Sequence, residues 1–159
     1  EIVLLGIVIG TLGLILTGAG LGLLHTMMGD GTGSPYMQLG ILFIILGTTM
    51  LIGEGALLVS SSSQASNGDL VNALSFFKIS QALGSFGVST VAIGFAIVGL
   101  GVSIQKNLNT ILAYAFIVIG LVGSVLSLWD YTSDLMFVWY LGSALLALIS
   151  GILILRSKE

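Results

Sequence analysis

The chain has 159 residues, 56% of them hydrophobic and 7% charged, and its mean hydropathy is +1.16. Roughly a quarter of the residues of an ordinary soluble domain are charged, so this composition excludes a water-soluble globular protein. Four basic residues in total leave no electrostatic surface for nucleic acid. The absence of cysteine excludes disulfides, thiolate metal sites and a cysteine nucleophile.

Long uncharged runs separate the few charged residues, and several of these runs can each hold one membrane span. A spanning helix needs about 20 mostly apolar residues. The runs of sufficient length cover residues 2–29, 31–53, 79–105, 107–129 and 135–155. The sequence therefore predicts an all-α, polytopic integral membrane bundle of five transmembrane helices in a single membrane domain. Four helices is the alternative, if the first run is peripheral to the bundle.

The first two predicted spans are separated by a glycine-rich turn. The first span covers about residues 2–28; it is longer than the apolar core of a secretory signal and lacks a basic head. Because the chain opens abruptly, a leader that precedes it stays an open alternative. The turn at 29–35 contains the single proline, Pro35. The second span covers about residues 36–59 and ends at the serine-rich segment 60–68, which we expect to be a solvent-exposed loop.

The third predicted helix, about residues 70–101, is too long for the hydrocarbon core. Asp69 is a suitable N-cap for it. At 1.5 Å per residue the helix extends about 48 Å, whereas the hydrocarbon core is about 30 Å thick. It should therefore tilt, project from the membrane or bend, with Gly84 and Gly87 as the bending points. Two shorter spans follow, at about residues 110–128 and 135–155.

Five spans place the two termini on opposite sides of the membrane, and the basic residues indicate which side is which. Lys106, Arg156 and Lys158 share one side, so the positive-inside rule makes that side cytoplasmic and leaves the N-terminus outside the cell membrane. An interfacial aromatic belt is expected at the outer end of the last two spans. Its members would be Trp129, Tyr131, Trp139 and Tyr140.

Small residues recur four positions apart in the first and last spans. In lipid, where no hydrophobic force joins helices, such residues let two backbones approach and make van der Waals contact. The candidate packing positions are Gly6, Gly10, Gly18 and Gly22 of the first span and Ala147 and Gly151 of the last. The favoured interpretation is packing inside the bundle. The alternative is docking of other membrane subunits or of further copies of the chain.

Glu54 and Lys78 are the two charges that lie inside predicted spans. An ionisable side chain within a span is expensive and marks a functional site by default. Glu54 lies six residues before the serine-rich segment and Lys78 nine residues after Asp69, so their depths agree within about one helical turn. We predict that they form an intramembrane charged pair. Its functional interpretation is a carboxylate that handles protons or ions; the favoured one is a structural ion pair, or two side chains that reach the interface separately.

His25, Met27 and Met28 lie together at the inner end of the first span. Imidazole and thioether groups suit copper(I), so these three residues are a weak candidate for a metal site. The favoured interpretation is a lone histidine hydrogen-bonded to a helix end, because neither a second imidazole nor a convergent carboxylate accompanies it. One histidine excludes a bis-histidine haem, and we expect no cofactor.

The sequence contains no recognisable catalytic constellation. His25 is expected at the inner side of the membrane and Glu54 near the outer side, so a Ser-His-acid triad cannot converge, and we expect no catalysis by the chain alone. The leading hypothesis is a small structural subunit of a larger membrane complex, with a lipid or quinone groove as a further part of it. The alternatives are a small transporter or ion or proton channel that uses Glu54, and a membrane-shaping virion or envelope protein. The expected partners are membrane lipids and other integral membrane subunits or further copies of the chain.

Overall fold

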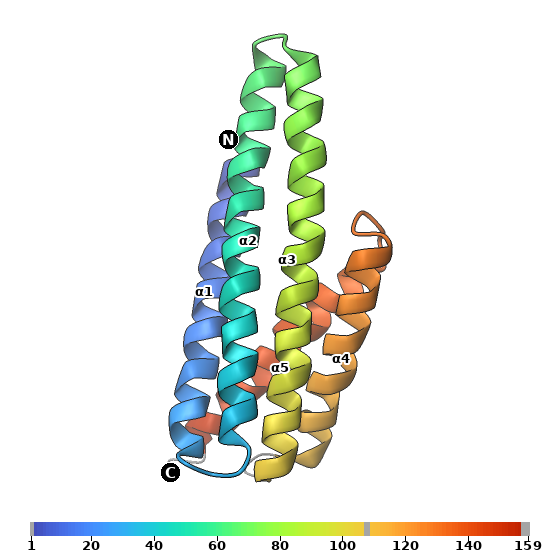
Figure 1. Ribbon diagram of the computed structural model, residues 1–159. Coiled ribbons are helices and arrows are strands. Elements are labelled where there is room, and N and C mark those ends of the chain that lie inside the picture. Colours follow the sequence, from blue (N-terminus) through green and yellow to red (C-terminus); the bar gives the residue numbers. More distant parts are fainter. Residues whose placement is uncertain (1, 107–108, 157–159) are drawn as a thin grey trace.

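The computed structural model describes residues 2–106 and 109–156, without the side chains of residues 2–4, 7, 11, 27, 28 and 154–156. Within these ranges the protein is all α, and five helices are long and apolar enough to cross a membrane, which confirms the predicted fold class. The helices are α1 (Ile2–Met28), α2 (Ser34–Ser66), α3 (Leu70–Gln105), α4 (Thr110–Trp129) and α5 (Met136–Arg156). The start of α1 and the end of α5 lie at opposite ends of the bundle (Figure 1).

Helices α2 and α3 form a long antiparallel hairpin that projects past the other helices (Figure 1). The prediction of a loop at 60–68 is wrong for most of that segment, because α2 continues to Ser66 and the turn comprises only residues 67–69. Serine hydroxyls in a helix can donate to carbonyls of their own backbone, as Ser60 does to Ala56 at 3.0 Å. The segment therefore tolerates its serines, and pairing with α3 keeps it helical.

Helix α3 is continuous over 36 residues, about 54 Å at 1.5 Å per residue. The Asp69 side chain accepts a hydrogen bond from the backbone nitrogen of Asn72 at 3.1 Å, which confirms the predicted N-cap. The end of α3 near Leu70 extends past the other helices (Figure 1), and tilt or projection relative to a membrane stays a prediction. The helix has no break at Gly84 or Gly87, the two predicted bending points, and both glycines face α2.

Glycines at intervals of seven residues line the contact between α2 and α3. A Cβ atom added at Gly40 would lie 2.8 Å from the Gly94 carbonyl oxygen, and one added at Gly47 would lie 2.6 Å from that of Gly87. Side chains larger than hydrogen are therefore excluded, and the two backbones touch. A seven-residue repeat keeps one seam of each helix facing its partner. We call these contacts the glycine ladder; its pairs are Gly33 with Gly101, Gly40 with Gly94, and Gly47 with Gly87.

The same seven-residue step continues beyond the glycines toward the tip of the hairpin. It brings Glu54 of α2 level with the buried Ser80 of α3, and the carboxylate itself lies against Gly84. One step further, the Ser61 hydroxyl donates to the carbonyl of Ala73 at 2.8 Å. Glu54 thus occupies a position in the helix–helix seam that glycine holds elsewhere, and its side chain must fit between the two helices.

The other helices pack around this hairpin. α4 lies against α3, where a Cβ at Gly120 would come 2.5 Å from the Ala92 carbonyl oxygen. An aromatic cluster fills the core between α3, α4 and α5: the Phe95 ring lies 5.5 Å from the Phe116 ring and 5.4 Å, edge to face, from the Trp139 ring system. α5 crosses the bundle obliquely and ends near the lower part of α1, and α1 packs mainly on α2 (Figure 1).

The five glycines predicted to pack helices have no atom close to the position of their missing Cβ. A Cβ atom added at Gly6, Gly10, Gly18, Gly22 or Gly151 would meet no other atom within 4 Å, the helix's own nearby backbone aside. The close approaches of the bundle use other glycines, on α2, α3 and α4. The alternative use of the α1 and α5 glycines, contact with other chains, stays a prediction.

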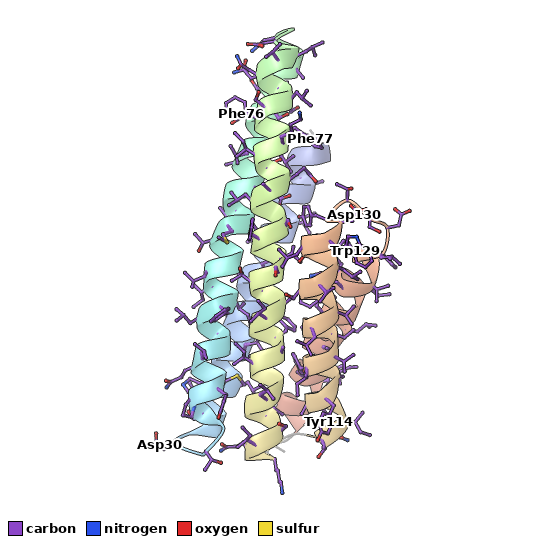
Figure 2. The ribbon with its side chains drawn as sticks, turned by 45° about the vertical axis from the view of Figure 1, so that its right-hand side comes forward. Asp30, Phe76, Phe77, Tyr114, Trp129 and Asp130 are labelled. Atoms are coloured by element: carbon purple, nitrogen blue, oxygen red, sulfur yellow. The ribbon has the colours of Figure 1, made fainter. Side chains whose placement is uncertain are left out.

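Helix lengths place Glu54 at the level where α4 and α5 meet. α4 and α5 contain 20 and 21 residues and so extend about 30 Å, the thickness of the hydrocarbon core. Glu54 lies about 30 Å along α2 from Ser34, level with the loop between α4 and α5. The rest of the hairpin rises about 18 Å further. Figure 2 shows Phe76 and Phe77 on this projecting part, above Trp129 and Asp130.

Candidate binding cavity around Glu54

The Glu54 carboxylate is buried between α2, α3 and the loop that joins α4 to α5. Its side chain is 8% exposed, and its two oxygens accept hydrogen bonds from the Tyr131 hydroxyl at 3.0 and 3.1 Å. The Tyr140 hydroxyl lies 3.5 Å from that of Tyr131 and extends the chain of polar groups. Gly84 makes the space, because a Cβ atom there would overlap the carboxylate. The result is a carboxylate–phenol–phenol cluster in apolar surroundings.

A compact turn positions Tyr131. The Asp130 side chain accepts hydrogen bonds from the backbone nitrogen and the hydroxyl of Thr132, at 3.0 and 2.8 Å, and the Met136 nitrogen donates to the Ser133 carbonyl at 3.0 Å. These bonds hold the phenol over α2. Burial raises the pKa of Tyr131 above its ordinary value, and the Tyr140 hydroxyl adds to the shift. A raised pKa keeps the phenol protonated, so Tyr131 remains a hydrogen-bond donor to Glu54.

A cavity of about 440 Å³ lies directly beside Glu54, between α1, α2, α3 and α5. Most of its wall is apolar. The polar side chains in its lining are Thr17, Glu54, Tyr131, Tyr140 and Ser143. Thr17 donates its hydroxyl to the Gly13 carbonyl at 2.9 Å and Ser143 donates to the Tyr140 carbonyl at 3.1 Å. The side-chain groups left to contact a ligand are therefore the Glu54 carboxylate, the two phenols and the indole N–H of Trp139.

A second cavity, of about 470 Å³, lies between α1 and α5 toward the other end of the bundle. It shares Thr17 and Phe95 with the first cavity, so the two are adjacent. Exposed side chains border it, among them Leu16 and Leu23 of α1 and Leu148 of α5. Both cavities therefore lie between α1 and α5, and exposed apolar side chains border the second one at the surface of the bundle. Gly10 and Gly151, predicted to pack helices, line these cavities instead.

The structure does not bring Lys78 to Glu54. Lys78 is exposed on α3, and among the residues that the structure describes no ion pair forms at the Glu54 carboxylate. The physical reason is rotational: Lys78 precedes the buried Ser80 by two residues, about 200° around the helix, so it points away from α2. Glu54 and Lys78 lie at similar depth on consecutive helices, but their side chains do not point toward each other.

The four residues predicted as an aromatic belt have different environments. Trp129 is 84% exposed at the end of α4, where an interfacial side chain belongs. Trp139 differs from the prediction: it is 3% exposed and packs on Gly123 and Phe95 in the core. Tyr131 and Tyr140 lie at the Glu54 carboxylate.

His25 contacts the first turn of α2. Its Nδ1 lies 3.5 Å from the Ser34 hydroxyl and its Nε2 lies 3.2 Å from the Gln38 side-chain nitrogen. The side chains of Met27 and Met28 fall outside the described residues, so the copper(I) candidate stays a prediction. In the described part of the chain, no group of three or more His, Cys, Asp or Glu side chains is placed to hold a metal ion.

Comparison with known proteins adds no relative to these observations. No protein-family model, curated protein or solved structure matches the chain. The function is therefore inferred from the cavity, its carboxylate and the exposed surfaces of the helices.

Sequence reasoning identified Glu54 but missed its partner and its cavity. Tyr131 lies 77 residues further along the chain, in a loop, and nothing in the sequence links the two. One feature of the sequence did indicate which way Glu54 faces. Gly33, Gly40 and Gly47 are spaced by seven residues, and the next step reaches Glu54, which indicates that the carboxylate faces the same neighbouring helix as the glycines.

Proposed function

We propose that the protein is a small integral membrane subunit that takes up a lipid-soluble molecule in the cavity beside Glu54. The observation that carries this proposal is an apolar cavity of about 440 Å³ with one buried carboxylate and two phenols at its edge. Small-molecule sites are typically concave, about 300–1,000 Å³ in volume and mostly apolar, with a few placed polar groups. The gap between α1 and α5 gives a ligand a route from the bilayer.

The lining of the second cavity, called the lower cavity below, favours ligand binding over ion conduction. A transporter or channel that used Glu54 would need polar groups on both sides of it. In the described lining of the lower cavity the polar side chains are Thr17 and Ser150, and each donates its hydroxyl to a carbonyl of its own helix. Tyr131 and Tyr140 lie at the other end, so the described polar groups gather on one side of the carboxylate.

Filling part of the cavity should weaken uptake without unfolding the protein. Gly13 lines the cavity, and no atom lies within 4 Å of the position that its Cβ would take, so leucine fits there. We expect Gly13→Leu to weaken binding of 1-pyrenebutanol, a neutral lipid-soluble probe, by about tenfold or more, or roughly 1.4 kcal/mol. Binding is measured in nanodiscs as energy transfer to pyrene from Trp139, which lines the cavity. The Trp129→Phe background removes the other tryptophan.

Gly18→Leu is the matched control for this experiment. Gly18 lies on the same helix, also has no atom within 4 Å of its missing Cβ and does not line either cavity. This variant should bind the probe as the parent does. Saturable binding that is the same for Gly13→Leu and Gly18→Leu would show that the probe sits elsewhere.

The projecting hairpin supports association with other chains. By its length the end of the hairpin extends beyond a 30 Å hydrocarbon core, yet Val71 is 78% exposed and Leu70 is 70% exposed, and Leu74 and Phe77 are exposed as well. Contiguous apolar side chains outside lipid mark a protein interface. This supports a subunit of a larger membrane complex, the leading hypothesis from the sequence. Lys106 lies at the opposite end of the bundle from this tip, which by the positive-inside rule supports a cytoplasmic C-terminus and an external tip.

Cysteine labelling tests orientation and partner together, because the chain has no native cysteine. In intact cells, a membrane-impermeant maleimide should label Ser62→Cys at the exposed hairpin tip but not Thr32→Cys in the turn between α1 and α2. Val71→Cys should resist labelling in the native membrane and react after the single chain has been isolated in a harsh detergent. Labelling of Thr32→Cys from outside would reverse the orientation. Equal labelling of Ser62→Cys and Val71→Cys in the native membrane would exclude a partner at the tip.

A further inference from the structure

We propose that the molecule bound in the cavity is a lipophilic organic cation: a protonated amine on an apolar body, with its ammonium group at Glu54. This inference rests on the proposed binding function and names the ligand class. It goes beyond the volume and apolarity of the cavity, which would admit many lipid-soluble molecules, because it uses the charge, the hydrogen-bonding groups and the aromatic rings that line it.

The charge of Glu54 is the first argument. An ionised carboxylate in apolar surroundings is costly unless a counter-charge neutralises it. Glu54 is 8% exposed, and in the described part of the chain it has a neutral phenol as its partner and no basic side chain. Lys78, the basic residue predicted to pair with it, points away. The counter-charge that the described residues do not supply must come from a proton or from a ligand, and the adjacent cavity is large enough for a ligand.

The hydrogen-bonding capacity of the cluster is the second argument. A carboxylate offers about four acceptor positions, and a single phenol proton, shared between both oxygens, is the one described donor to Glu54. The Tyr140 hydroxyl also has acceptor capacity toward the cavity. An ammonium group carries three donors and no acceptor, so it complements this set. A carboxylate or phosphate would instead be repelled by Glu54.

The aromatic rings are the third argument. Tyr131 and Tyr140 line the cavity at its carboxylate end, and Trp139 and Phe95, whose ring centroids lie 5.4 Å apart, line it as well. Cations are attracted to the faces of tyrosine and tryptophan rings, most strongly where water is excluded. The glycine and aliphatic side chains of α1 and α2 leave space for the apolar body of the ligand. The cavity therefore suits an amphiphilic cation, with its charged head group at Glu54 and its apolar body in the remaining volume.

Three probes that share one apolar frame test this inference on the unaltered cavity. 1-Pyrenebutylamine is a cation at pH 7, because alkylamines have a pKa near that of lysine, about 10.4. 1-Pyrenebutanol is neutral and 1-pyrenebutanoate is an anion. In neutral nanodiscs, with Trp139 as donor in the Trp129→Phe background, we expect the amine to bind about tenfold or more tightly than the alcohol. The anion should bind most weakly, and excess cyclohexylpropylamine should displace the amine probe.

Glu54→Gln then assigns the preference to the carboxylate. Glutamine keeps the shape of the side chain and an oxygen that accepts from Tyr131, so the variant should lose the tenfold preference for the amine over the alcohol. Asp30→Asn removes an equal charge from the turn between α1 and α2, remote from the cavity, and should keep that preference. The comparison of the three probes on the protein with Glu54 intact tests the inference even where Glu54→Gln does not fold.

The outcomes separate this inference from the binding function itself. The cation proposal would be overturned if the amine and the alcohol bound equally, saturably and in a way that depends on Gly13, or if the alcohol bound more tightly. Either result would leave the binding function standing. A protonated, neutral Glu54 predicts such a result. A preference for the amine that survives Glu54→Gln would also overturn it. The absence of saturable binding for all three probes would overturn both proposals.

Discussion

Alanine in place of Gly94 should lower the free energy of unfolding by about 2–3 kcal/mol, the cost of overpacking a tight interface. The added Cβ atom would lie 2.6 Å from Cγ1 of Ile44 and 2.7 Å from the Gly40 carbonyl oxygen. The second contact is with backbone, which cannot rotate away, so α2 and α3 must separate along the glycine ladder. Unfolding in mixed micelles of rising SDS content, followed by circular dichroism, measures the change.

Gly22→Ala gives the control for the glycine ladder. No atom lies within 4 Å of the position of the Gly22 Cβ, so alanine there should leave stability unchanged or raise it by up to about 1 kcal/mol through helix propensity. Gly40→Ala should act like Gly94→Ala. Because Gly40 and Gly94 touch, the double variant should lower the free energy of unfolding by less than the sum of the two single decreases. Equal stability of Gly94→Ala and Gly22→Ala would contradict the ladder.

Removal of the Tyr131 hydroxyl should destabilise the protein by about 1.5–3 kcal/mol, the range for a hydrogen bond to a charged group. Tyr131→Phe leaves the buried Glu54 carboxylate without its described donor. Combined with Glu54→Gln in a double-mutant cycle, it should show a coupling energy of about 1 kcal/mol or more. The same unfolding measurement in mixed micelles is made on the parent protein, the two single variants and the double variant.

A second cycle tests the pair that the sequence predicted. Lys78 is exposed and makes no ion pair with Glu54, so Lys78→Ala and Glu54→Gln should be additive within about 0.5 kcal/mol. Strong coupling between Glu54 and Lys78, together with additivity between Glu54 and Tyr131, would mean that the carboxylate has the partner expected from the sequence and not the one seen in the structure.

Hydropathy and charge spacing were sufficient to predict the five helices, because each uncharged run must be helical to satisfy its backbone in lipid. The same signals failed at the end of α2. Segment 60–68 is polar and was assigned to a loop, but Ser60 bonds its own helix and Ser61 bonds Ala73 across the hairpin, so the helix persists to Ser66. Tertiary pairing decided that boundary, and local composition does not report it.

The sequence was sufficient to single out Glu54, but it did not predict which residues surround the carboxylate. The rarity of charge pointed to Glu54, since a carboxylate within a span needs an explanation. The choice of Lys78 used depth alone and ignored the direction of each side chain around its helix. Tyr131 and the α1–α5 gap depend on how the last hairpin and the first helix pack, which a single sequence with uniform hydrophobicity does not specify.

The repeat of the glycine ladder leaves the alignment of the hairpin ambiguous, and Glu54 resolves it. If α3 slid by seven residues, Gly40 would meet Gly101 and Gly47 would meet Gly94, so small residues would again face one another. The carboxylate would then meet Val91 where Gly84 now leaves space. A slide in the other direction would bring Phe77 to that place. One buried polar residue can select a single register among near-equivalent ones, so the residue with which we associate ligand binding also makes the pairing of α2 with α3 unique.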